Sequence, residues 1–174
     1  VPLAGNRPGE AVEVQCFAPS ASADLLLVRR NRPVDASTVT LWNVREEEAT
    51  ATFHGEFRIE VGHRFTLEAD LPSRWIIDSV VSSPATALAD WSLSDAADRR
   101  RTLSLRLAQP LAPDRPLRVT IVGRLKHHNA GDRLTREQMR FVEFRNTADP
   151  RPLYGLRAEE GLRLQLRDSD DSKA

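Results

Sequence analysis

Apolar and polar side chains alternate along most of this chain, and the alternation is clearest in the stretch from Leu105 to Arg124. There Leu, Val and Ile alternate with Arg and Thr on both sides of a proline-rich link. Successive side chains of a strand point to opposite faces of a sheet, so the pattern predicts strands with one apolar and one wet face. Arg106 and Arg118 belong to the polar set, and we place both on the wet face of one antiparallel sheet.

A long strand is predicted upstream by apolar residues of one parity: Ala51, Phe53, Phe57, Ile59 and Val61. Gly55 interrupts this set and is expected to form a bend or a bulge. The alternation resumes at Phe65. A three-residue loop between the two segments would make a hairpin in which Ile59 faces Leu67.

The middle of the chain has the same character. Trp75 and Val80 have opposite parity, so we place them on opposite faces of one strand. A strand that begins at Trp91 can pair with the leucine-rich strand 103–107. That strand is in turn expected to pair with strand 117–121 across the proline-rich link, whose prolines keep it out of a central strand.

The C-terminal part predicts another hairpin. Glu159-Glu160-Gly161 has the composition of a three-residue loop in which the glycine adopts the left-handed conformation. Leu156 would then face Leu164, and Tyr154 would face Leu166.

These patterns predict an all-β fold, an antiparallel β-sandwich of about eleven strands with little or no helix. We expect an N-terminal extension over residues 1–10, a single domain over 11–167 and a disordered tail over 168–174. A split into two small sandwiches near 71–72 is the second choice, because no flexible linker marks it.

Three segments resemble a known group of modules: Leu71-Pro72-Ser73-Arg74-Trp75, Asp90-Trp91-Ser92-Leu93, and the run from Arg101 to Pro113. Their order is similar to that of immunoglobulin-like β-sandwich modules in large, mostly uncharacterised envelope or secreted proteins of bacteria. The resemblance covers about residues 51–124. It implies a spacer or an interaction platform, and it brings no catalytic residues.

The composition excludes several classes of protein. The 174 residues include 25 basic and 25 acidic side chains, so no net charge attracts nucleic acid or an anionic membrane. Unbroken apolar runs reach only four or five residues, whereas a membrane span needs roughly 18. Cys16 is the only cysteine, so no disulfide can form within the chain, and we expect it to be a small buried side chain.

No motif for catalysis or for a cofactor is present. The chain has no G-x-S-x-G turn, phosphate-binding loop or dinucleotide fingerprint. Glu46-Glu47-Glu48 and Glu159-Glu160 fall in predicted turns, where carboxylates are usually solvated. A metal needs three or four converging ligands, and the spacing of His127, His128 and Asp132 does not supply them. We therefore expect no enzyme activity, no cofactor and no metal.

The candidate ligand-binding residues are Trp42, Arg106, Arg118, His127 and His128. The arginines could pair with carboxylates of a second chain, and edge strands could accept a partner strand. Trp42, Trp75 and Trp91 could form a platform for sugar rings, or they could fill the core. Trp42 is ambiguous because Val39 and Leu41 have the opposite parity.

The sequence therefore predicts a non-catalytic module of a larger extracytoplasmic protein, a spacer or a platform for protein partners. A carbohydrate-binding module with exposed tryptophan is the alternative, and an enzyme of unknown class is third. The solvent exposure of the three tryptophans separates the first two hypotheses.

Overall fold

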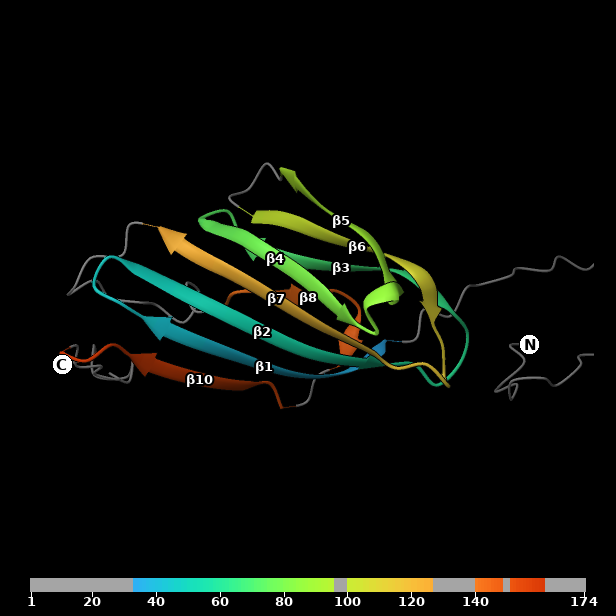
Figure 1. Cartoon of the computed structure of the whole chain (residues 1–174). Helices are drawn as coiled ribbons and strands as arrows, with labels where there is room; N and C mark the ends of the chain where they lie inside the picture. Colours follow the sequence, from blue (N-terminus) through green and yellow to red (C-terminus); the bar gives the residue numbers. More distant parts are fainter. Residues whose placement is uncertain (1–32, 96–99, 127–139, 149–150, 162–174) are drawn as a thin grey trace, which may run out of the picture. The chain divides into compact units, whose positions relative to one another are not determined.

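A computed structural model describes residues 33–95, 100–126, 140–148 and 151–161. They all belong to the second of the two compact units of the chain, Asn31–Ala174. Within the described residues, ten strands form two sheets that pack as a β-sandwich (Figure 1), and one short 3-10 turn connects two of the strands. This confirms the all-β sandwich. The predicted extension over 1–10 and tail over 168–174 lie outside the described residues, so the predicted domain boundaries stay predictions.

The two sheets differ in width. Sheet A has six strands in the order β10-β1-β2-β7-β4, with β9 also paired to β1, and sheet B has four in the order β5-β6-β3-β8. The strands of sheet A are β1 Val34–Val44, β2 Glu48–Arg58, β4 Trp75–Ser83, β7 Leu117–Lys126, β9 Thr147–Ala148 and β10 Leu153–Ala158. Those of sheet B are β3 Arg64–Pro72, β5 Leu88–Asp95, β6 Arg100–Leu111 and β8 Glu143–Phe144. The 3-10 turn η1, Ala85–Ala87, lies between β4 and β5.

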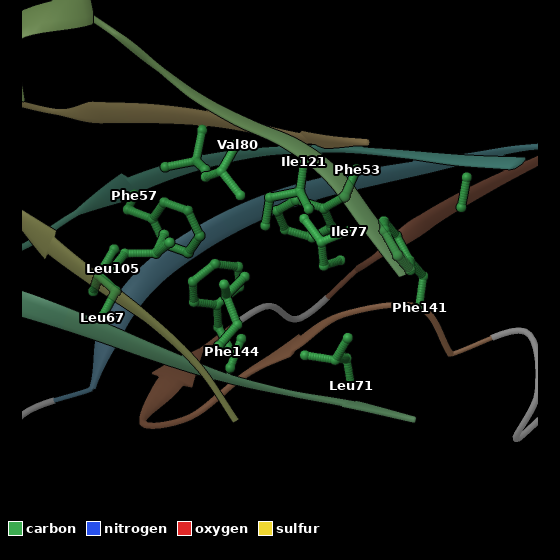
Figure 2. Packing of buried hydrophobic residues seen from close by; sticks show 14 of the residues in the cluster. Phe53, Phe57, Leu67, Leu71, Ile77, Val80, Leu105, Ile121, Phe141 and Phe144 are labelled. Carbon is green, nitrogen blue, oxygen red and sulfur yellow. The ribbon is translucent and has the colours of Figure 1, made fainter. Parts of the chain in front are cut away.

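The apolar faces of the two sheets meet in one core. Phe53 and Phe57 of β2 lie against Phe144 of β8, with ring centroids 5.5 Å and 4.6 Å apart (Figure 2). Leu67 and Leu105 line the facing side from sheet B, and both are buried. The alternation of the sequence therefore does place one face of each strand in the core.

An aromatic cluster fills one part of this core. Trp42 meets Trp75 edge to face at 4.8 Å, and Phe141 lies 4.6 Å from Trp75. Trp42 is in register with Ala51 on β2, and Ala51 is in register with Gly123 on β7. A Cβ atom on Gly123 would come within 2.7 Å of the Phe141 ring. The small residues thus make room for the large rings.

Two of the predicted hairpins are wrong. The chain passes from sheet A to sheet B between β2 and β3, so Ile59 does not pair with Leu67. It returns to sheet A between β6 and β7, so strands 103–107 and 117–121 are not neighbours. Ile59 and Leu67 are nevertheless both buried. A period of two determines which face is buried but not which strand lies alongside.

The predicted pairing of the Trp91 strand is confirmed, because Trp91 of β5 lies opposite Leu105 of β6. The sheets are not wholly antiparallel, however: β9 and β10 run parallel to β1. Most of the described chain separates β1 from β10, so no short turn imposes an antiparallel arrangement there. Gly161 has the expected positive φ of 95°. Its predicted hairpin partners Leu164 and Leu166 lie outside the described residues.

The prediction for Val80 is also wrong. The register between β4 and β7 shifts between Ile77 and Ser79, which indicates an irregularity of the β-bulge type. The extra residue reverses the parity of the positions after it, so Val80 is buried like Trp75 and Ile77 rather than on the opposite face.

Gly55 does not form the predicted bulge. It keeps continuous register with Thr38 on β1 and Val119 on β7. A Cβ atom there would come within 2.7 Å of the Phe53 ring and 2.9 Å of the Phe57 ring. Glycine therefore allows these two rings to approach each other over the middle of β2.

Candidate docking face

The outer face of sheet B is polar. Its side chains are Thr66, Glu68, Asp70, Asp90, Ser92, Ser94, Thr102, Ser104 and Arg106. No large hydrophobic side chain stands among these described positions. This is the wet surface that a solvated sheet face is expected to have.

Arg145 forms hydrogen bonds with several side chains of this polar surface. Its Nε donates to both carboxylate oxygens of Asp70 at 3.1 Å, its Nη2 donates to Thr102 at 3.0 Å, and its Nη1 donates to Glu68 at 3.4 Å. Hydrogen bonding to Asp70, followed by the charges of Asp70 and Glu68, raises the pKa of Arg145 above its ordinary value. The guanidinium is thus engaged within the chain, and we assign it a structural role.

The outer face of sheet A is different, because several of its strands present apolar side chains there. We call Val39, Leu41, Val81, Val122 and Leu153 the outer strip. Val39 lies opposite Leu153 of β10, and Leu41 is linked through Thr52 to Val122 of β7. Leu41, Val81 and Leu153 are 48%, 55% and 62% exposed. Strands β10, β1, β7 and β4 thus each contribute apolar side chains to this face, while Thr52 and His54 of β2 lie between them.

The side chain of Leu41 packs over a glycine of β10. Gly155 is its register partner, and a Cβ atom at Gly155 would lie only 2.6 Å from Cδ2 of Leu41. The missing side chain leaves a shallow place in which the leucine lies. Tyr154 and Leu156 are also exposed on β10 but have the opposite parity, so they face the other side of the sheet.

A charged cluster lies on the same face of sheet A. Nε of Arg58 donates to Oε1 of Glu56 at 2.8 Å, and Nε of Arg118 donates to Oε2 at 2.9 Å. Hydrogen bonds from Arg58, and next from Arg118, lower the pKa of the Glu56 carboxyl below its ordinary value of 4.5. Beside this cluster, Nδ1 of His54 lies 3.1 Å from the Thr120 hydroxyl.

Trp42 is not a surface residue, and its prediction as a ligand-binding residue is corrected here. Trp42 and Trp75 are each 1% exposed. Trp91 is half-buried and packs against the core. Because β1 has Trp42 on its buried face, Val39 and Leu41 point outward, which resolves the ambiguity of parity. The rings of Trp42 and Trp75 cannot stack on a sugar.

Arg106 and Arg118 do not share a surface, contrary to the prediction. Arg106 lies on β6 in sheet B, 3.9 Å from Asp90, and Arg118 lies on β7 in sheet A. The outer faces of the two sheets point away from each other. The error comes from pairing β6 with β7, and Arg118 lies on the outer face of sheet A.

The candidates His127 and His128 lie outside the described residues, as do Asp132 and Cys16. His54 and His63 are exposed at different places, on β2 and in the β2–β3 connection. Within the part of the chain that the structure describes, no three metal-binding side chains gather. In that same part, no helix is long and apolar enough to cross a membrane.

The outer strip was missed by sequence reasoning. The signal was present: Val39 and Leu41 are apolar at positions whose parity differs from that of Trp42. A strand that is apolar on both faces is either buried on both sides or exposes one apolar face. The choice between them depends on what covers sheet A, which a period of two does not determine.

A small cavity lies elsewhere, beside the β6–β7 crossover. Its volume is about 200 Å³, and Pro84, Pro110, Pro116, Leu107 and Leu117 form part of its lining. Asp114 and Arg115, also in the lining, are exposed side chains 3.7 Å apart. Asp114 is the one carboxylate among these lining residues, which include no histidine, serine or cysteine to act with it.

The chain matches no family model and no curated protein. Among solved structures, the M1 zinc metallopeptidase from Deinococcus radiodurans is 12% identical with a TM-score of 0.42, over 55% of this chain and 21% of that chain. The seventh ScaB type I cohesin from Pseudobacteroides cellulosolvens is 11% identical with a TM-score of 0.38, over 76% of this chain and 97% of that chain. This chain thus spans about a fifth of the metallopeptidase, and neither likeness establishes a family or a function.

Proposed function

We propose that the chain is a non-catalytic β-sandwich module of a larger extracytoplasmic protein, and that it binds another protein through the outer strip of sheet A. The supporting observation is the contrast between the two outer faces. The outer positions named above for sheet B are polar, whereas the outer face of sheet A exposes Leu41, Val81 and Leu153. Exposed apolar side chains gathered on one face of a folded domain are typical of a surface that another protein covers.

The test uses peptides selected from displayed random libraries on the full chain. Selected peptides gather where apolar surface can be removed from water, because that removal drives most association. Binding is then compared between the parent chain and the double variant Leu41→Lys/Leu153→Lys. The matched control is Thr66→Lys/Ser92→Lys, which adds the same charge to the outer face of sheet B.

We expect the Leu41→Lys/Leu153→Lys variant to lose at least tenfold in affinity and the control variant to bind like the parent. Circular dichroism of all variants checks that they are folded. Selection of no binder, or of peptides that bind both variants equally, would refute a docking role for the outer strip.

A further inference from the structure

Glu56 holds two arginines at the surface of sheet A. Arg58 and Arg118 each donate to a different oxygen of this one carboxylate. Their side chains are 68% and 71% exposed, while that of Glu56 is 25% exposed. A guanidinium has five N–H donors, so Nη1 of Arg58 and both Nη groups of Arg118 are not engaged by Glu56.

The pair lies close to the outer strip. Glu56 is two residues from His54 on the same face of β2, a distance of about 7 Å along a strand. His54 is the register partner of Val39 in the outer strip, and Thr120 next to it is the partner of Val81. One extended segment of a partner could therefore touch both the apolar side chains and the arginines.

The charges disfavour a second copy of this chain as the occupant. At the opposite end of the face, Arg124 pairs with Asp78 at 3.3 Å and Arg157 lies on the same outer side. Two copies packed face to face would set the Nη groups of Arg58 and Arg118 against themselves or beside Arg124 and Arg157. The nearby carboxylates Glu56 and Asp78 are already engaged by arginines of their own chain. Like charges opposed across an interface cost binding free energy.

We infer that the protein partner presents a carboxylate to Arg118 and Arg58 while its apolar side chains cover the outer strip. This inference rests on the proposed function. Glu56 engages only Nε of Arg118, so both Nη groups of this exposed arginine are donors that a partner's carboxylate can meet. Asp35 lies opposite Arg58 in the β1–β2 register and balances its charge, so Arg118 is the principal contact for the partner's carboxylate. Arg–carboxylate contacts are strong and directional, and Arg145 with Asp70 already shows the two-oxygen form in this protein.

The experiment extends the peptide selection. Peptides that depend on Leu41 and Leu153 are sequenced, and their affinity is measured with Arg118→Gln. The matched control is Arg106→Gln, an arginine that is equally exposed at 72% but lies on sheet B. The peptide is also made with its acidic residue changed to the amide, so that the two changes form a double-mutant cycle.

We expect a fixed Asp or Glu beside the apolar residues of the selected peptides. Arg118→Gln and the amide change should each weaken binding five- to tenfold, and together no more than either alone. Arg106→Gln should have no effect. Strip-dependent peptides that lack an acid, or that ignore Arg118→Gln, would overturn this inference and leave the proposed function intact. A phosphoserine peptide that needs Arg118 when the Asp and Glu forms do not bind would also overturn it.

Discussion

At the scale of single residues, small side chains determine where large ones lie. Ala51 and Gly123 on the buried face of sheet A leave space for Trp42, Trp75 and Phe141. Gly155, on the outer side of the same sheet, leaves space for Leu41. A glycine therefore makes room for a buried ring at position 123 and for an exposed leucine of the outer strip at position 155.

Adding one methyl group at Gly123 should destabilise the fold. The new Cβ would lie 2.7 Å from the Phe141 ring and 2.8 Å from the carbonyl oxygen of Ile76, and the backbone atom cannot rotate away. Overpacking of this kind costs about 1–3 kcal/mol. We expect Gly123→Ala to lower the free energy of unfolding, measured by urea denaturation, by an amount in that range.

The control for this prediction is Gly155→Ala. Its new Cβ would meet only Cδ2 of the half-exposed Leu41, which can turn into solvent. Its free energy of unfolding should stay within about 0.5 kcal/mol of the parent. Equal stabilities of the Gly123→Ala variant and the parent would contradict the packing of Phe141 against β7.

At the scale of elements, the sequence predicts which face of a strand is buried better than it predicts which strands pair. Alternation correctly identified the buried sides of β2, β6, β7 and of β3 from Leu67 onward, because apolar side chains leave water whatever strand lies alongside. It was wrong for Val61 and Phe65, which share that parity but are 55% and 57% exposed. It failed for pairing, since a link such as the one between β6 and β7 can be a hairpin or a crossover between sheets. It also failed within β4, where the register shift after Ile77 reverses parity without any signal in composition.

Cross-linking can test the corrected neighbours. His54 of β2 and Thr120 of β7 are register partners whose polar atoms lie 3.1 Å apart. Opposed residues of antiparallel strands have Cβ atoms about 5 Å apart, within small adjustments of disulfide geometry. With Cys16→Ser as background, we expect His54→Cys/Thr120→Cys to lose both free thiols on mild oxidation.

The comparison pair is Arg106→Cys/Thr120→Cys in the same background. A β6–β7 hairpin would bring these positions together on one wet face. In the sandwich they lie on the outer sides of two different sheets, whose planes are about 10 Å apart. Oxidation of this pair within one chain, without dimer formation, would contradict the crossover and restore the hairpin.

At the scale of the whole molecule, the two outer faces of the sandwich differ, because sheet A exposes Leu41, Val81 and Leu153 whereas the outer positions named for sheet B are polar. Arg145 and its carboxylate partners engage the polar groups of sheet B within the chain. The outer strip has no such internal partner among the described residues. Net charge is zero, so long-range attraction would contribute little, and recognition would depend on the local match of apolar surface and the Glu56 arginine pair.

This division predicts which substitutions are tolerated by the fold. Leu41 and Leu153 are exposed, so Leu41→Lys/Leu153→Lys should change the free energy of unfolding by no more than about 0.5 kcal/mol per site. The buried Leu105 is the reference, since Leu105→Ala should cost about 2–5 kcal/mol.

The double lysine variant should also bind less of an apolar fluorescent dye than the parent. If it instead unfolds as readily as Leu105→Ala, the strip is covered within the full chain, because only a buried position resists a lysine so strongly. The surface would then belong to the interior of this protein, and neither an outside partner nor its carboxylate would be needed to explain the strip.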